Sequence, residues 1–183
     1  NNHTYENTTG IFVVLLPQLS SKVSRDTLVY DNLSEDNNLD NFGRAGTAVS
    51  LLPPGVGILL LGSDHNEVYG NTLTGNKTTG VAVFSLTGTG TFDANELDVG
   101  PLPEGNYVYD NSYENNGYDP DEMIEELGIP AGDILWDGTG AGNQFDETGD
   151  VSSFPPMLPS TGWPEFAQRA YGNILTFVIG LIG

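Results

Sequence analysis

Two recurring motifs and their spacing predict an all-β fold, a parallel β-helix with inserted loops. Three segments align without a gap, and each contains Val-Tyr, one further residue and then Asn: TLVYDNLSEDN (27–37), NEVYGNTLTGN (66–76) and NYVYDNSYENN (106–116). A glycine followed by apolar residues also recurs, in TTGIFVV (8–14), VGILLL (56–61) and TTGVAVF (78–84). Gly57 and Gly80 are 23 residues apart, whereas Tyr30 precedes Tyr69 by 39. A 23-residue unit without a 3.6-residue apolar period, enlarged by whole loops, is typical of β-helix rungs and not of helical repeats.

In such a fold, equivalent residues of successive rungs lie above one another at about 4.8 Å. We therefore expect one tyrosine column and one asparagine column, formed by Tyr30, Tyr69 and Tyr109 and by Asn32, Asn71 and Asn111. Asparagine tolerates the left-handed backbone of a sharp corner, and its amide can bond the amides above and below. Inward-facing apolar columns are expected to include Val68, Leu73, Val81 and Val83.

The remaining segments are expected to form loops, one short helix and a tail. The inserts are the stretches 14–26, 38–56, 85–105 and 117–132. In the last insert, DPDEMIEELGIP predicts a helix with Asp119 as its N-cap, Glu122 closing a capping box and Gly128 ending it. DILWDG continues the strands, and Asn143-Gln144-Phe145 predicts a last partial rung.

The chain divides by composition into rungs at 1–150 and a Pro-rich tail at 151–183. We expect the tail to be extended and to pack on the rungs or cap them. The apolar residues 174–183 amount to about half of a membrane span, so a final strand or packed tail is favoured over a membrane anchor, and no membrane span is expected.

Composition narrows the classes of function. The chain has 183 residues, of which 25 are acidic and 5 basic, for a net charge of −20. That balance excludes nucleic-acid binding and argues against adhesion to anionic lipid. The absence of cysteine excludes disulfides and thiolate metal sites, and it is compatible with a bacterial extracytoplasmic protein. A salty habitat is a second interpretation of the same charge.

The rung motif resembles a known family. GIFVVLLPQL, SLLPPGVGILLLGSDHNEVYGNTLTGNKTTGVAVFS and AGDILWDGTG resemble bacterial parallel β-helix repeat domain proteins of the pectate-lyase-like right-handed β-helix superfamily, over roughly residues 5–145. That group is exported and has no assigned activity. The resemblance implies a right-handed winding and an extracytoplasmic location, in the periplasm, on the outer surface or secreted.

The N-terminal end of the predicted β-helix is expected to need a cover. Thr8-Thr9-Gly10 already matches Thr78-Thr79-Gly80, so the sequence begins inside a rung. An uncovered rung exposes unpaired strand edges. We therefore expect missing upstream rungs or a protein partner there.

No catalytic residue is predicted. Lyases of this fold use Arg or Lys beside carboxylates that bind Ca²⁺, but Arg25 and Arg44 lie in or beside inserts. Asp31 and Asp110 are equivalent, yet Gly70 stands between them and favours a solvated corner. The turn GSDHNE favours a surface role for His65 over a base for Ser63 or Ser85.

Metal and sugar sites have few candidates. Asp119, Asp121 and Glu122 could bind Ca²⁺, although helix capping already explains two of them. No other cofactor is expected, since two His and two Met are few for copper. Trp136 could face in or out, and Trp163 is expected to anchor the tail.

These observations favour a non-enzymatic, exported β-helix module that acts as a structural or interaction subunit of a cell-envelope or extracellular assembly. The alternative is a carbohydrate-active protein, a polysaccharide lyase, epimerase or sugar binder, whose active rungs lie upstream. A third interpretation is a Ca²⁺-dependent surface protein.

Overall fold

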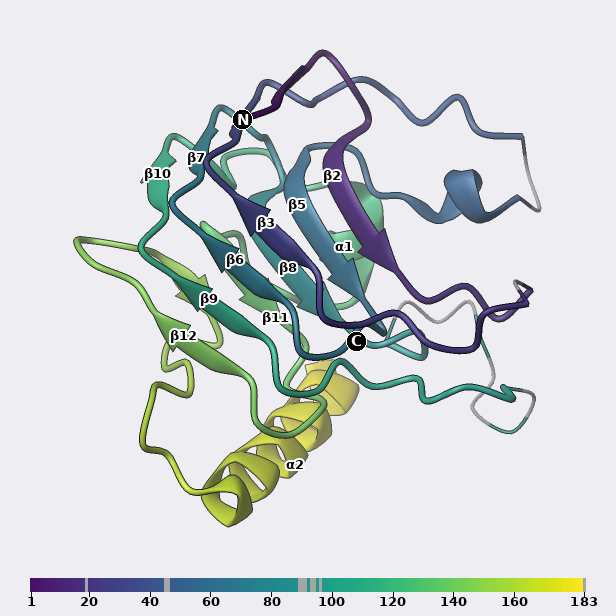
Figure 1. Cartoon of the computed structure of the whole chain (residues 1–183), viewed down its shortest axis with the longest axis vertical. Helices are drawn as coiled ribbons and strands as arrows, with labels where there is room; N and C mark the ends of the chain where they lie inside the picture. Colours follow the sequence, from purple (N-terminus) through teal and green to yellow (C-terminus); the bar gives the residue numbers. More distant parts are fainter. Residues whose placement is uncertain (19, 45–46, 89–91, 93–94, 96, 183) are drawn as a thin grey trace.

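Three all-parallel sheets form the body of the computed structural model (Figure 1). The structure describes residues 1–18, 20–44, 47–88, 92, 95 and 97–182. Sheet 1 has the strand order β1 (His3–Tyr5), β4 (Leu33–Glu35), β7 (Thr72–Thr74) and β10 (Ser112–Glu114). Sheet 2 has the order β13 (Ser153–Phe154), β11 (Ile134–Trp136), β8 (Thr79–Phe84), β5 (Val56–Leu61) and β2 (Thr9–Val14). Sheet 3 has the order β12 (Gln144–Asp146), β9 (Tyr107–Tyr109), β6 (Glu67–Tyr69) and β3 (Leu28–Tyr30). The prediction of an all-β fold with parallel strands is confirmed.

The chain visits sheets 1, 2 and 3 in that order four times. We call each such set of three strands a circuit: circuit 1 is β1, β2 and β3, and circuit 4 is β10, β11 and β12. Equivalent residues pair in register, so that Val29 lies beside Val68 and Val68 beside Val108. The repeat in the sequence therefore corresponds to a repeat in the strand pairing.

The core lies between the sheets. Inward side chains from all three form one apolar cluster, which includes the predicted Val68, Leu73, Val81 and Val83. Strands β5 and β8 are buried along their whole length because alternate residues enter two different cores. Ile58 and Leu60 point to the inner cluster, whereas Leu59 and Leu61 join a second cluster on the other face of sheet 2. This double burial explains why VGILLL is continuously apolar.

The second cluster is covered by an insert. Helix α1 (Glu122–Glu126) supplies the buried Ile124, which packs there with Ile129. The N-cap of α1 is Asp121, whose side chain accepts a hydrogen bond from the Met123 amide at 3.2 Å. The prediction of Asp119 as the N-cap and Glu122 as its capping-box partner is wrong: the cap lies two residues later, so Glu122 is the first residue of the helix. The backbone N–H of Asp119 donates to the Lys77 carbonyl. A 3₁₀ helix, η1 (Ala48–Leu51), lies in the insert after β4.

The expectation of an extended tail is wrong for its second half. Residues Glu165–Ile182 form helix α2, which lies below the sheets in Figure 1. The last proline of the chain is Pro164, so nothing beyond it interrupts helical hydrogen bonding. Tyr171 and Leu175 pack against the inner cluster, and the Tyr171 ring lies 6.4 Å from that of Trp136. Among the described residues, no helix is long and apolar enough to cross a membrane.

Candidate functional site: the outer edge of circuit 1

Two columns of side chains run across the circuits. The rings of Tyr30 and Tyr69 stack at 5.2 Å between centroids, and those of Tyr69 and Tyr109 at 5.0 Å. Along the neighbouring corner, the Asn32 amide donates to Asn71 Oδ1 at 2.8 Å, and the Asn71 amide donates to Asn111 Oδ1 at 2.9 Å. The residues named for the two expected columns therefore lie above one another.

We expected the left-handed backbone at the ladder asparagines, but it lies one residue before them. Asp31, Gly70 and Asp110 have φ of 53°, 61° and 52° at this corner. The following asparagine points its side chain into the corner, where its oxygen also accepts the backbone N–H of the equivalent asparagine, at 3.1 Å for Asn32 and 3.0 Å for Asn71. The asparagine thus serves as the bridge between circuits, and its neighbour makes the turn.

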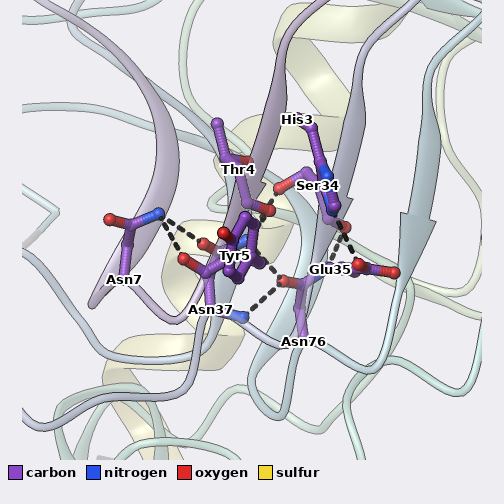
Figure 2. A network of polar contacts seen from close by, with 8 residues as sticks. All are labelled: His3, Thr4, Tyr5, Asn7, Ser34, Glu35, Asn37 and Asn76. Atoms are coloured by element: carbon purple, nitrogen blue, oxygen red, sulfur yellow. Dashed lines mark hydrogen bonds and ion pairs between the residues drawn. The ribbon is translucent and has the colours of Figure 1, made fainter.

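All three corners carry such bridges, whereas the sequence interpretation named the residues of one column. The first ladder is Asn2, Asn32, Asn71 and Asn111. The second is Asn7, Asn37, Asn76 and Asn116, part of which Figure 2 shows. The third is Asn66, Asn106 and Asn143. The spacing of five between Asn66, Asn71 and Asn76 was the signal, because it places one asparagine at each corner around a three-residue strand.

The first two ladders end on carboxylates in the C-terminal part of the fold. Asn111 donates to Glu147 Oε1 at 2.8 Å, and Asn116 donates to Asp133 Oδ1 at 3.2 Å. Burial raises the pKa of Glu147 against the hydrogen bonds from Asn111 and Tyr113, which lower it. These carboxylates accept hydrogen bonds from the side-chain amides of the last two asparagines, which would otherwise be buried without an acceptor.

Circuit 1 is open on its outer side. Strands β1, β2 and β3 are each the last strand of their sheet, and β2 is only half-buried, whereas β5 and β8 are fully buried. A hollow of about 520 Å³ opens there, lined by Asn2, Thr4, Ile11, Val13, Leu28 and Val29 among others. Thr4 Oγ1 is buried and has no hydrogen-bond partner among the residues that the structure describes, and Tyr30 has 45% of its surface exposed. An apolar floor with free strand edges is a place where another chain can pair.

The carboxylates considered for catalysis do not lie next to one another. Asp31, Gly70 and Asp110 share one corner, as the repeat predicts, with the glycine between the two acids. Asp110 borders a polar hollow of about 430 Å³ together with Thr148 and Asp150. His65 has a φ of 51°, and its amide donates to the Glu104 carbonyl at 2.7 Å, so it forms a corner. Ser63 bonds Ser24 and Asn66.

Asp137 is a buried carboxylate that sequence reasoning did not single out. It accepts the Ser85 amide at 2.7 Å and both the amide and the hydroxyl of Thr139, at 3.0 and 2.6 Å. Burial raises its pKa, and these hydrogen bonds oppose the rise. The side chain lines a cavity of about 200 Å³ with Leu127 and Ile129. Because Thr139 belongs to the turn after β11 and Ser85 directly follows β8, Asp137 joins the end of β11 to that of β8.

Asp119, Asp121 and Glu122 surround the start of α1, where Asp121 caps the helix. In the part of the chain that the structure describes, no group of three His, Cys, Asp or Glu residues is placed to hold a metal ion. Trp136 is fully buried and faces the inner cluster, and Trp163 lies edge-on to Tyr171 at 5.8 Å between centroids. Neither indole lies on an open sheet face.

The outer face of sheet 3 combines the tyrosine column with acids. The Tyr109 hydroxyl donates to Glu67 Oε2 at 3.0 Å, and the Tyr107 hydroxyl donates to Asp146 Oδ2 at 3.0 Å. Burial beneath neighbouring groups and the Glu67 carboxylate raise the pKa of Tyr109 to about 12. These phenols are therefore neutral hydrogen-bond donors across the physiological range.

Comparison with known proteins gives no match: no family model, no curated protein and no solved structure is significantly similar to the chain. The functional argument therefore rests on the geometry described above.

Proposed function

We propose that this chain is a right-handed parallel β-helix module and serves as a non-catalytic structural or interaction subunit of an exported, extracytoplasmic assembly. The observation that carries the proposal is the outer edge of circuit 1, where the free edges of three sheets surround an apolar hollow. The four ordered circuits support the winding, and parallel strands joined by crossovers in one sheet are right-handed in about 98% of cases. The resemblance of the rung motif to exported β-helix repeat proteins supports the compartment, as does the lack of cysteine.

The contacts of such a subunit come from the open edge and from the inserted loops. Loops positioned by a rigid scaffold are the usual carriers of recognition. A net charge of −20 keeps the module soluble and favours neutral or basic partners.

One observation favours a second candidate, a carbohydrate-active protein: a lyase, an epimerase or a sugar binder whose active rungs lie upstream. The outer face of sheet 3 presents Tyr107 and Tyr109, each bonded to a carboxylate, in a column that continues through Tyr69 to Tyr30. Fixed phenols and carboxylates suit the hydroxyl groups of a sugar chain.

A glycan array combined with an assay for unsaturated uronate products tests the two candidates. The interaction proposal expects neither turnover nor sugar affinity in the micromolar range. A matched pair of variants, Tyr69→Ala on sheet 3 and Phe166→Ala on α2, distinguishes specific from background sugar binding. Turnover, or sugar binding that Tyr69→Ala abolishes and Phe166→Ala retains, would replace the first proposal by the second.

A further inference from the structure

The asparagine ladders have a direction. In each one, the side-chain Nδ2 donates toward the next circuit along the chain, from Asn2 to Asn32 at 2.8 Å and from Asn7 to Asn37 at 3.0 Å at the start of the first two. Each interior Oδ1 accepts from the circuit before it. Among the described residues, nothing donates to Oδ1 of Asn2 or Asn7, which begin the ladders. The outer edge of circuit 1 therefore presents side-chain acceptors that match amide donors.

Amide donors alone would not fill the hollow, because its floor is apolar and is formed by Ile11, Val13 and Val29. The equivalent residues of circuit 2 are Ile58, Leu60 and Val68, and all three are fully buried. Tyr30 stacks on Tyr69 through one ring face and remains 45% exposed. A segment that fits must therefore supply parallel strands, apolar side chains at alternate positions and an aromatic ring.

A second copy of this chain does not meet these requirements. Its C-terminal end is covered by β13 and α2, and its ladders end there on the acceptor-only groups of Glu147 and Asp133. Two open edges placed face to face would set the oxygens of Asn2 and Asn7 among further acceptors. Each copy also carries a net charge of −20. Both effects oppose self-association through this edge.

We propose that the outer edge of circuit 1 receives a segment of a different polypeptide, neutral or basic, that adds one parallel strand to each of the three sheets. Its corner asparagines donate to Oδ1 of Asn2 and Asn7, its apolar side chains fill the hollow, and an aromatic ring covers Tyr30. This inference rests on the proposed interaction function and names the class of partner.

A probe of this chemistry can be taken from the chain itself. The synthetic peptide NEVYGNTLTGNKTTGVAVF, residues 66–84, contains the sheet 1 strand β7 and the sheet 2 strand β8, which match the free edges of β1 and β2, and its Glu67 and Lys77 charges cancel. Docked in register before circuit 1, its Asn71 lies over Asn2 and its Asn76 over Asn7. Its Asn66 begins the sheet 3 strand, which precedes β7 along the chain and therefore lies one circuit beyond the position beside β3, so Asn66 meets no residue of circuit 1 and is a matched control.

Titration of the intact 183-residue chain with this peptide, followed by calorimetry and by backbone amide chemical shifts, tests the proposal. We expect binding, with shift changes confined to β1, β2 and the corners at Asn2 and Asn7. The peptides Asn71→Ala and Asn76→Ala should each bind about fivefold more weakly, the effect of one hydrogen bond, whereas Asn66→Ala should bind like the parent. On the chain, Ile11→Lys should reduce affinity at least tenfold, and Phe166→Lys on α2 should leave it unchanged.

Three results would overturn the proposal. These are no binding at millimolar peptide, an equal loss for all three asparagine peptides, or a dimer of the chain that Ile11→Lys dissociates. The peptide variants leave the chain unaltered, so the test survives if Ile11→Lys fails to fold. If the peptide does not bind and no sugar turnover or sugar binding is found, this inference is wrong, but the proposed interaction function still holds with the loops as its contact surface. Sugar turnover would instead refute the interaction function, whether or not the peptide binds.

Discussion

At the scale of single residues, the asparagine side chains use both of their polar ends. Asn71 is 1% exposed; its oxygen accepts the amide and side chain of Asn32, and its Nδ2 donates to Asn111 and to the carbonyls of Val29 and Tyr69. Asn71→Ala leaves these buried groups unpaired, and we expect a loss of about 2 to 3 kcal/mol in the free energy of unfolding. Urea denaturation measures this loss.

The matched control for that variant is Asn173→Ala, which removes an exposed asparagine from α2 and should change stability by less than about 0.5 kcal/mol. Asn71→Asp keeps the acceptor oxygen and replaces the donor NH₂ group with a second acceptor, so it should also destabilise the fold. If Asn71→Ala were as stable as the parent protein, the ladder would not hold the circuits together.

The tyrosine column makes a prediction for pH. Burial and the hydrogen bond to Glu67 raise the pKa of Tyr109 to about 12, above the ordinary value of 10.0. A raised pKa means that the neutral phenol is favoured by folding, so its contribution to stability is complete below pH 10.0 and is lost as the pH rises through about 12. Titration of the ¹³Cζ resonance of Tyr109 by NMR measures its pKa.

Glu67→Gln should bring the Tyr109 pKa down toward 10.0, because the carboxylate charge disappears while an amide oxygen still accepts the hydroxyl. Glu35→Gln, on sheet 1, is the matched control and should leave the Tyr109 pKa unchanged. A Tyr109 pKa that is the same in the parent and in Glu67→Gln would contradict the role of the carboxylate.

Which residues stack could be predicted from the sequence, whereas how they turn the chain could not. Identical motifs at fixed spacing require equivalent positions, and this requirement places Tyr30, Tyr69 and Tyr109 in one column. The choice of the residue with positive φ depends on local geometry. The position with positive φ holds Asp31, Gly70 and Asp110, and because both Asp and Gly occur there, it is not marked by an invariant residue as the Val-Tyr and Asn positions are.

At the scale of elements, α2 presents two different faces. Leu175 packs against the inner cluster beside Gly138, whereas its neighbour Ile174 is 60% exposed. We expect Leu175→Ala to cost about 1 to 2 kcal/mol, less than a fully buried leucine, because part of its side chain already meets solvent. Thermal denaturation of the two alanine variants measures the difference.

Ile174→Ala is the matched control for Leu175→Ala, one residue away on the same helix, and it should leave the melting temperature close to that of the parent. Equal losses from both variants would mean that α2 contributes helical propensity alone and does not cover circuit 4.

The strands could be predicted element by element and α2 could not, for a physical reason. In the sequence, a strand of this fold is a short apolar run bounded by Gly or Asn. The run VGILLL is apolar at every position, which indicates that both faces of the strand are buried. The tail begins with Pro155, Pro156, Pro159 and Pro164, which predict an extended chain, and those residues are indeed outside α2. Helix α2 begins just beyond them, where packing on the inner cluster selects a helix in an apolar segment that could equally form a strand.

At the scale of the whole molecule, the two ends of the stack of circuits are treated differently. Circuit 4 is covered by β13 and α2, with carboxylates receiving the last amide donors, while circuit 1 leaves acceptors, strand edges and a hollow exposed. The sequence repeat predicted that the first rung would need a cover. The polarity of that end follows only from the direction in which each amide is turned, and no sequence pattern specifies this direction.

The net charge makes the last prediction, which also tests the calcium interpretation. With 25 acidic and 5 basic residues, repulsion among carboxylates is opposed, within the described residues, by the exposed ion pairs of Lys22 with Asp98 and of Arg25 with Asp26. Salt screens the repulsion more than these few attractions. We expect the melting temperature to rise with NaCl at pH 7, and to rise less at pH 4, where many carboxylates are protonated.

CaCl₂ at the same ionic strength is the control for this salt effect. Screening alone requires that Ca²⁺ and Na⁺ give the same melting temperature and that EDTA changes nothing, because in the described part of the chain no group of three acids is placed to hold a metal ion. A larger rise with Ca²⁺ that Asp121→Asn removes would instead assign a calcium site to the start of α1. A melting temperature that falls as NaCl is added would mean that the exposed ion pairs outweigh the repulsion, and the argument from net charge would fail.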